Sequence, residues 1–141
     1  RGLGDVYKRQ LIDCGPSLGM LTINALTAAD SVIIPVEAEY LSAKGMELLL
    51  RSVAMTKRKL NPSLKIDGIL ITRVDKRNNL SGQIIKMVRD AYESLNIFDS
   101  QIPERIAVGK SLSKHELVAG FEKNSDAAIA YKKLAQEVLA K

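Results

Sequence analysis

The sequence predicts an α/β fold in which a parallel sheet is flanked by helices in three layers. Two observations support this expectation. Short runs of β-branched and aliphatic residues at 31–35 and 66–72 have the length of buried strands. Between and after them lie longer stretches in which apolar residues recur every three or four positions, as on one face of a helix. Strands that alternate with helices in this way are typical of parallel sheets.

The composition indicates one domain, or part of a larger one, with an aliphatic core. Of its 141 residues 46% are hydrophobic but only 4% are aromatic, and there is no tryptophan. No apolar run approaches the roughly 20 residues that a membrane span needs, and no secretory signal pattern opens the chain. The single cysteine, Cys14, excludes an internal disulfide and suits a reducing cytosol. The net charge of +5 permits nucleic-acid contact without requiring it.

The stretch Leu11–Gly19 predicts the end of a further buried strand that leads through a loop into a helix. Two apolar residues precede Asp13, and a Gly-Pro turn follows it. Ligands of open α/β sheets bind at the carboxyl ends of the strands, where an aspartate can hold a Mg²⁺-bound water. The alternative is that Asp13 only serves the turn.

Three more strands and four helices are expected along the chain. The strands are Ser31–Pro35, which Pro35 is expected to end, Ile66–Thr72 and Phe98–Ile102. The helices are 18–28 with Ser17 as N-cap, 42–60, 81–95, and a last one capped by Ser125 or Asn124. Their expected buried residues are Leu18, Leu21, Ile23 and Leu26; Met46, Leu49, Leu50 and Val53; Ile84, Val88, Ala91, Tyr92 and Leu95; and Ala127, Tyr131, Leu134 and Val138. Residues expected to face outward are Lys86, Arg89, Asp90, Lys132, Lys133 and Glu137.

Basic residues gather at the end of the second helix. The segment from Arg51 through Lys65 contains five basic residues and no acidic one. Lys57, Arg58 and Lys59 suit the negative end of a helix dipole, which is the interpretation we favour, and a DNA contact is the alternative. The lone His115 is interpreted as a solvated residue because no partner residues for acid–base chemistry accompany it.

The longest motif resembles a known family. Residues 12–35 read I-D-C-G-P-S-L-G-M-L-T-I-N-A-L-T-A-A-D-S-V-I-I-P, which closely resembles the ParA/Soj family of deviant-Walker ATPases that partition chromosomes and plasmids. The resemblance covers about residues 11–141. It includes a T-x-x-D-x-R run that begins at Thr72 and an Ile-Pro pair at Ile102.

The resemblance implies a nucleotide site that binds ATP and Mg²⁺ in a P-loop NTPase-like fold. Asp13 would hold the Mg²⁺ through a water, as the catalytic and metal residue. The switch loop would comprise Cys14, Gly15, Pro16 and Ser17, where Gly15 replaces a family proline. The positions that face the base would be Thr72, Arg73, Pro103 and Glu104, and Glu104 stands where the family has arginine.

The resemblance also implies partners. ATP-bound homodimers of the family bind DNA without reading its sequence and are stimulated by a ParB-like protein, so we expect a nucleoid-associated cytoplasmic protein with no membrane contact. Arg77 matches a family arginine implicated in DNA binding, and Lys76 lies beside it. A second family arginine is replaced by Ala107, with Arg105 and Lys110 as nearby substitutes.

The chain departs from the family pattern in two places. The chain contains no glycine-rich loop followed by lysine and threonine, so it is expected to be the C-terminal half of the ATPase fold and inactive alone. Charged residues in 1–10 replace an expected apolar strand, which predicts a non-native junction before a domain at 11–141. The alternatives are a MinD-like membrane-associated division-site regulator, which would use residues 126–141, and a non-catalytic nucleotide-fold remnant.

Overall fold

The computed structural model describes residues 10–140 except 16, 39–42, 76, 78, 105–112, 116, 118–119 and 121. Its helices and strands are α1 (Met20–Ala28), β1 (Ser31–Glu37), α2 (Ala43–Lys59), β2 (Lys65–Val74), α3 (Asn79–Ala91), β3 (Ile97–Pro103) and α6 (Asp126–Leu139). They divide between two compact units. One comprises residues 1–31 and 44–65, and the other comprises 32–43 and 66–141.

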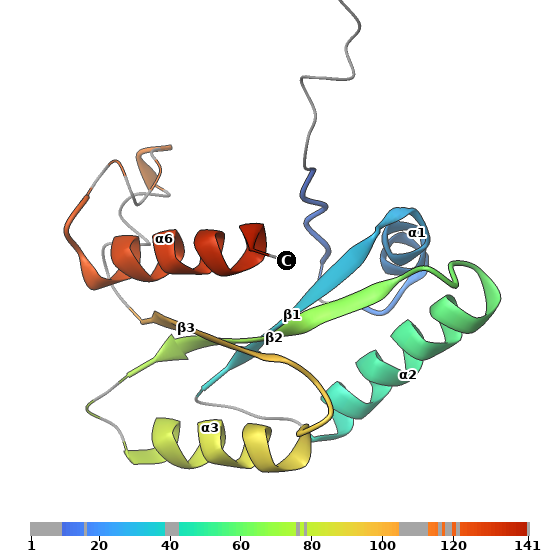
Figure 1. Cartoon of the computed structure of the whole chain (residues 1–141), viewed down its shortest axis with the longest axis horizontal. Coiled ribbons are helices and arrows are strands. Elements are labelled where there is room, and N and C mark those ends of the chain that lie inside the picture. The colour runs from blue at the N-terminus through green and yellow to red at the C-terminus, as the bar shows by residue number, and fades with distance from the viewer. Residues whose placement is uncertain are drawn as a thin grey trace, which may run out of the picture. The chain divides into compact units, whose positions relative to one another are not determined.

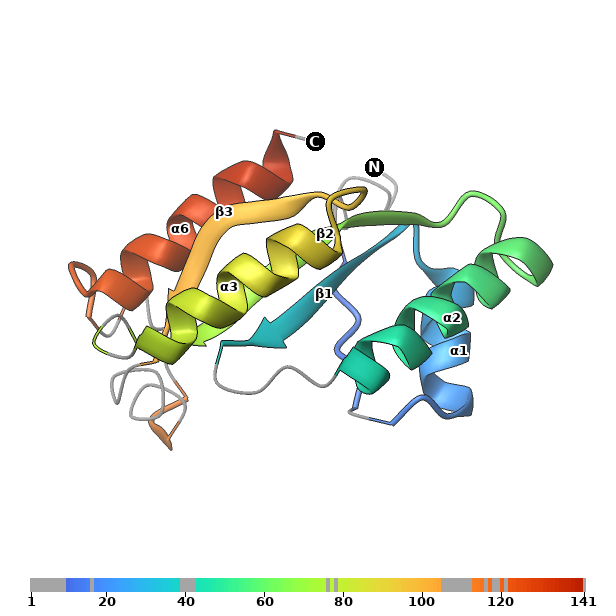
Figure 2. The ribbon, with the colours of Figure 1, turned by 90° about the horizontal axis from the view of Figure 1, so that it is seen from below.

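The second unit contains the predicted parallel sheet. Its strands are arranged in the order β1-β2-β3, and β3 pairs parallel to β2 from Ile69–Ile97 to Val74–Pro103. Helices α3 and α6 cover opposite faces of this sheet (Figure 1, Figure 2). The α/β fold with helices on both faces of a parallel sheet is therefore confirmed.

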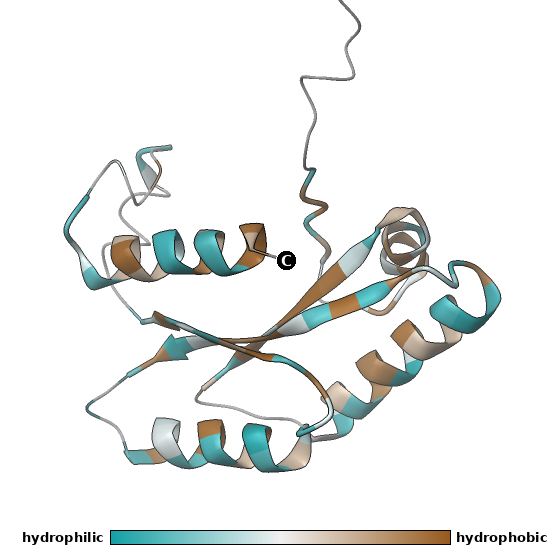
Figure 3. Cartoon of the chain, viewed as in Figure 1, coloured by the Kyte–Doolittle hydropathy of each residue, from teal (hydrophilic) through white to brown (hydrophobic). Residues whose placement is uncertain are grey.

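The interface between α6 and the sheet forms an aliphatic core around one aromatic residue. Phe98 is 2% exposed and packs with Leu70 and Ile102, and side chains of α6 pack against this cluster. The contributing residues of α6 are Ala130, Leu134 and Val138. Figure 3 shows hydrophobic residues along β1, both hydrophobic and hydrophilic residues along β3, and turns of both kinds along α6. The last helix is thus docked by its apolar face, although Tyr131 is 40% exposed and the prediction that it is buried is wrong.

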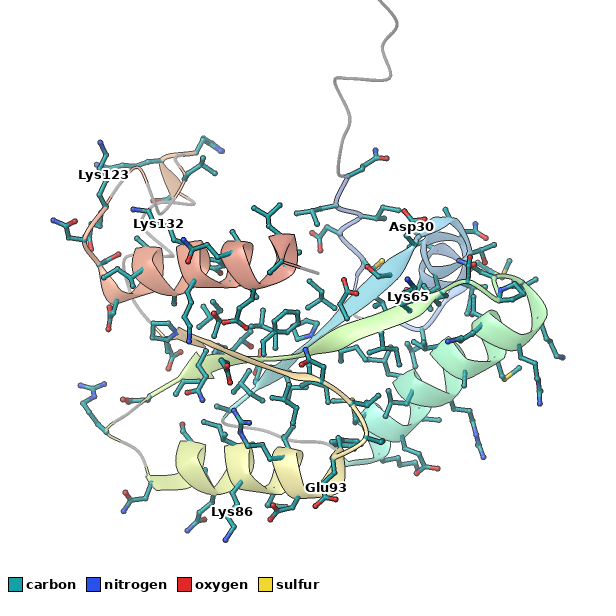
Figure 4. All side chains as sticks on the ribbon, in the orientation of Figure 1. Asp30, Lys65, Lys86, Glu93, Lys123 and Lys132 are labelled. Atoms are coloured by element: carbon teal, nitrogen blue, oxygen red, sulfur yellow. The ribbon has the colours of Figure 1, made fainter. Side chains whose placement is uncertain are left out.

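The predicted start of α6 is confirmed, whereas the bounds of α3 differ from the prediction. The Ser125 hydroxyl accepts a hydrogen bond from Ala128 N at 3.2 Å and caps α6, as predicted. Helix α3 begins two residues earlier than expected and ends at Ala91, short of Leu95. Its outward residues Lys86, Arg89 and Asp90 are exposed as predicted, and Figure 4 shows Lys86 pointing away from the sheet.

Strand β1 continues through Pro35 to Glu37, so the prediction that Pro35 ends it is wrong. Ala38 N donates to Thr72 O at 2.9 Å, which shows that alternate residues of this strand point their N–H groups toward β2. Pro35 belongs to the other set, so the N–H that it lacks would face the open edge of the described sheet. Proline is tolerated at such an edge.

The first unit is held together by hydrogen bonds between distant segments. The side-chain amide of Asn61 donates to Leu26 O at 3.1 Å and Ala29 O at 2.7 Å, at the end of α1. Lys65 N donates to Asp30 O at 3.1 Å, and Figure 4 shows these two residues side by side. In α2 the predicted residues Met46 and Val53 are buried.

Three expectations for the start of this unit are wrong. Residues 10–15 form no strand, and Leu11 and Ile12 are 91% and 50% exposed, because no described strand pairs with them. Gly19 rather than Ser17 is the N-cap of α1, and the backbone carbonyl of Ser17 instead accepts a hydrogen bond from the Thr22 hydroxyl at 2.6 Å. Helix α1 buries Leu26 but leaves Leu18 and Leu21 exposed.

Candidate functional site

The carboxyl ends of the three strands gather polar residues at one edge of the sheet. Thr72 lies near the end of β2, and its hydroxyl donates to Val36 O of β1 at 3.2 Å. Pro103 ends β3 and is buried, and Glu104 N donates to Val74 O at 3.2 Å. Parallel strands present their carboxyl ends to the same edge, which is where open α/β sheets bind ligands.

Arg73 joins the ends of all three strands. Its Nη2 lies 2.8 Å from Oε1 of Glu104, and its Nη1 lies 3.5 Å from Oε2 of Glu37. The side chains of Arg73, Glu37 and Glu104 are 48%, 52% and 43% exposed. Ion pairs with this exposure contribute little to stability, on the order of 0–1 kcal/mol, so their main effect is to orient the guanidinium.

The backbone at Arg73 is unusual. Its φ is 53°, in the left-handed region, and the pairing of β2 with β3 shifts register between Ile71 and Val74. A non-glycine residue pays about 1–2 kcal/mol for this conformation, and such residues often occur at functional sites. The irregularity places Arg73 between Glu37 and Glu104.

All four residues predicted to face the base therefore come together: Thr72, Arg73, Pro103 and Glu104. Sequence reasoning did not assign Glu37 to this site. The available signal was its position just after the predicted strand Ser31–Pro35. The pairing with Arg73 could not be foreseen, since it depends on the relative register of β1 and β2.

The loop after β2 holds a second, separate ion pair. The guanidinium of Arg77 donates from Nε to Oδ1 and from Nη2 to Oδ2 of Asp75, each at 3.0 Å. The Arg77 backbone N–H also donates to Oδ1 at 3.0 Å. The hydrogen bond from Asp75, and then its charge, raise the already high pKa of Arg77, so Arg77 is a cation throughout the usual pH range. The Arg77 side chain is 88% exposed, so its remaining nitrogen faces solvent.

The other DNA-binding residues named from the sequence, Lys76, Arg105 and Lys110, lie outside the described residues, as does Pro16 of the switch loop. His115 is exposed in a turn with a φ of 54°, as expected for a solvated residue.

Asp13 belongs to the first unit and is exposed in a segment without secondary structure. Cys14 beside it is an exposed free thiol, and a Cβ added at Gly15 would meet no atom within 4 Å. Among the residues that the structure describes, no three His, Cys, Asp or Glu side chains gather as a metal site. One accessible carboxylate nevertheless fits Mg²⁺, which keeps several waters and takes few protein ligands when phosphates complete its shell.

Curated proteins match nearly the whole chain. It is 38% identical over 135 residues to the chromosome partitioning protein ParA of Caulobacter vibrioides, a match that covers 96% of this chain and 50% of ParA. It is 40% identical over 134 residues to the sporulation initiation inhibitor protein Soj of Bacillus subtilis, covering 95% and 53%. The chain is therefore similar to ParA and Soj over nearly its whole length. A family model described as an AAA domain also matches residues 3–66.

The chain spans about half the length of these relatives. Its fold also matches crystal structures of a cobyrinic acid a,c-diamide synthase from Mycobacterium smegmatis. The form with a bound ATP analog and magnesium gives a TM-score of 0.74 at 36% identity, covering 90% of this chain and 45% of that one. The form with ADP and magnesium gives 0.73 at 35% identity. Nucleotide and Mg²⁺ are therefore bound by structural neighbours of the fold.

None of the described helices of this chain is long and apolar enough to cross a membrane.

Proposed function

We propose that this chain is the C-terminal part of an ATP-dependent partitioning ATPase. The observation that carries the proposal is the meeting of Thr72, Arg73, Pro103 and Glu104 at the carboxyl edge of the sheet, in a chain that resembles ParA and Soj over nearly its whole length. The structural neighbour is a diamide synthase and not a partitioning protein, so the fold match supports nucleotide binding rather than partitioning.

Each part of the site then has a role. Pro103 offers a buried apolar surface to the base, while the polar atoms of Thr72, Arg73 and Glu104 surround it. The Arg73 guanidinium is held in place by Glu37 and Glu104 and needs little reordering when the nucleotide binds. Asp13 would hold Mg²⁺ through water, and the loop of residues 14–17 would change conformation with the nucleotide state. Bound Mg²⁺ supplies neutralisation of phosphate charge during hydrolysis.

DNA binding is proposed for the loop after β2. Arg77, with Lys76, Arg105 and Lys110, would contact phosphates of DNA of any sequence, in a salt-dependent manner. The active species would be an ATP-bound homodimer in the cytoplasm at the nucleoid, stimulated by a ParB-like protein. The chain by itself is expected not to hydrolyse ATP, because it contains no glycine-rich loop with a lysine to hold the phosphates.

The nucleotide site is tested by Asp13→Asn in the polypeptide translated from the complete reading frame. We expect loss of ATP hydrolysis and of ATP-dependent dimerisation, measured by phosphate release and light scattering. Asp90→Asn, an exposed carboxylate on α3, is the matched control and should behave as wild type. Normal hydrolysis and dimerisation by the Asp13 variant would overturn its assignment.

The DNA site is tested by Arg77→Glu in the same polypeptide with ATP. Retention on a DNA column should fall at every salt concentration, and the slope of affinity against salt should decrease. Arg89→Glu on α3 makes the same charge change elsewhere. Equal retention by the two variants would remove Arg77 from the proposed interface.

A further inference from the structure

Helix α2 carries an exposed stripe in which cations and apolar residues alternate. The α2 stripe consists of Lys44, Leu48, Arg51, Met55 and Arg58. The residues are spaced alternately by four and three positions, so they follow the 3.5-residue period of a coiled-coil seam. Leu48 and Met55 occupy one of the two seam positions, and the three cations occupy the other.

The stripe is separate from the buried face of the helix. Met46, Val53 and Thr56 are at most 6% exposed, whereas Leu48 and Met55 are 45% and 46% exposed. Arg51, Ala54, Met55 and Arg58 line a shallow hollow in the surface of α2. Figure 3 shows hydrophobic and hydrophilic turns following one another along this helix. The solvent-facing side of a helix is usually polar, so apolar residues at coiled-coil spacing on this side indicate a contact surface.

The cations of the stripe are available to a partner. Lys44, Arg51 and Arg58 form no ion pair with any described residue. The one acidic residue of α2, Glu47, flanks the stripe and does not pair with Arg51. Arg51 and Arg58 are seven residues apart, which is about 10 Å along a helix axis.

We propose that the α2 stripe docks an acidic amphipathic helix of a partner protein. Leucines of that helix would pack against Leu48 and Met55, and its glutamates would pair with Lys44, Arg51 and Arg58. Methionine suits such a contact because its flexible side chain adapts to the shape of a partner. The charge of the stripe decides which class of helix fits, because like charges across a helix pair are destabilising.

Other occupants fit the stripe less well. A second copy of α2 would bring the cations of the two stripes against one another. Duplex DNA would pair with the cations but leave Leu48 and Met55 exposed to water, since phosphate contacts bury no apolar side chain. An anionic membrane favours helices with bulky aromatic or several leucine anchors, and the stripe offers only two apolar residues.

The test uses the 141-residue chain and a synthetic probe helix of three heptads, with leucine opposite Leu48 and Met55 and glutamate opposite the cations. Binding is followed by fluorescence anisotropy of the labelled probe. Arg51→Glu/Arg58→Glu should weaken binding by about tenfold or more, which is the factor that corresponds to 1.4 kcal/mol. A probe with lysine in place of glutamate should bind this variant better than it binds wild type.

Lys57→Glu/Lys65→Glu is the matched control. Both lysines are exposed and lie off the stripe, and the double substitution changes the net charge as much as Arg51→Glu/Arg58→Glu does. It should weaken binding by less than about threefold. Met55→Gln tests the apolar contact and should also reduce affinity. Circular dichroism melting of each variant shows whether it is folded.

Three outcomes would overturn the proposal. The first is that wild type shows no saturable binding to the acidic probe. The second is that the control variant loses as much affinity as the stripe variant, or that Met55→Gln loses none. The third is that only duplex DNA, or vesicles of phosphatidylserine and phosphatidylcholine, bind in a manner that depends on Arg51 and Arg58. The stripe is built from α2 alone, so binding is expected without ATP, and a failure of the nucleotide site would leave this result unchanged.

Discussion

The sheet-containing unit and the segment that carries Asp13 hold their functional candidates in different ways. In the sheet unit, Arg73 is positioned by carboxylates from two other strand ends, at 2.8 and 3.5 Å. Asp13 lies beside Leu11 and Ile12, which are 91% and 50% exposed, and no strand forms there. The difference teaches that a residue at the end of a strand is held in position by side chains of the neighbouring strands. A local sequence motif alone does not position it.

Phe98→Ala should give the largest loss of stability. It tests whether packing of the core stabilises the sheet-containing unit. Phe98 is 2% exposed between the sheet and α6, so truncation should cost about 3–5 kcal/mol of unfolding free energy. Urea denaturation measures the change. Leu11→Ala, at 91% exposure, is the control and should cost less than about 0.5 kcal/mol. Similar losses for both variants would mean that the two regions do not differ as described.

Gly68→Ala should give the second-largest loss of stability, because β2 passes close to the turn before β3. Gly68 has a φ of 155°, and a Cβ there would lie 2.5 Å from Nδ2 and 2.7 Å from O of Asn96. Backbone strain and this clash should destabilise the protein by about 1–3 kcal/mol, measured by thermal melting. Gly15→Ala, with open space around its Cα, should melt within a few degrees of wild type. An unchanged melting temperature for Gly68→Ala would contradict the close approach.

Glu137→Gln compares a carboxylate that is hydrogen-bonded within the sheet-containing unit with the exposed carboxylate of Asp13. Glu137 accepts hydrogen bonds from Asp99 N at 3.0 Å and from the Ser100 hydroxyl at 2.5 Å, so the prediction that it faces outward is wrong. Its side chain is 23% exposed, and weaker, uncharged hydrogen bonds should cost about 1–2 kcal/mol in urea denaturation. Asp13→Asn should leave stability unchanged. If both variants are neutral, Glu137 does not anchor α6 to β3.

Asp75→Asn should give the smallest effect, on DNA affinity. Asp75 neutralises Arg77 and occupies two nitrogens of its guanidinium. Exposed ion pairs of this kind are weak, so removing the charge should tighten DNA binding by only about 1.5- to 5-fold. Fluorescence anisotropy with labelled duplex DNA measures it, with Asp90→Asn as control. Weaker binding would show instead that Asp75 positions Arg77 for the phosphate.

The sequence by itself determined the α/β class, the approximate position of every described helix and strand, and the Ser125 cap. These depend on periodicity and on contacts within a few residues. It also placed Thr72, Arg73, Pro103 and Glu104 at strand ends, and the structure brings them together there. Their contact with a nucleotide base stays a prediction.

Only the tertiary structure decided which side chains meet. The contact between Arg73 and Glu104 joins residues 31 positions apart, and it depends on the order and register of β2 and β3. Pro35 remains in β1 because the N–H that it lacks would face the edge of the described sheet. Leu11 and Ile12 form no strand despite an apolar pattern, because backbone N–H and C=O groups need a pairing partner that the pattern cannot supply.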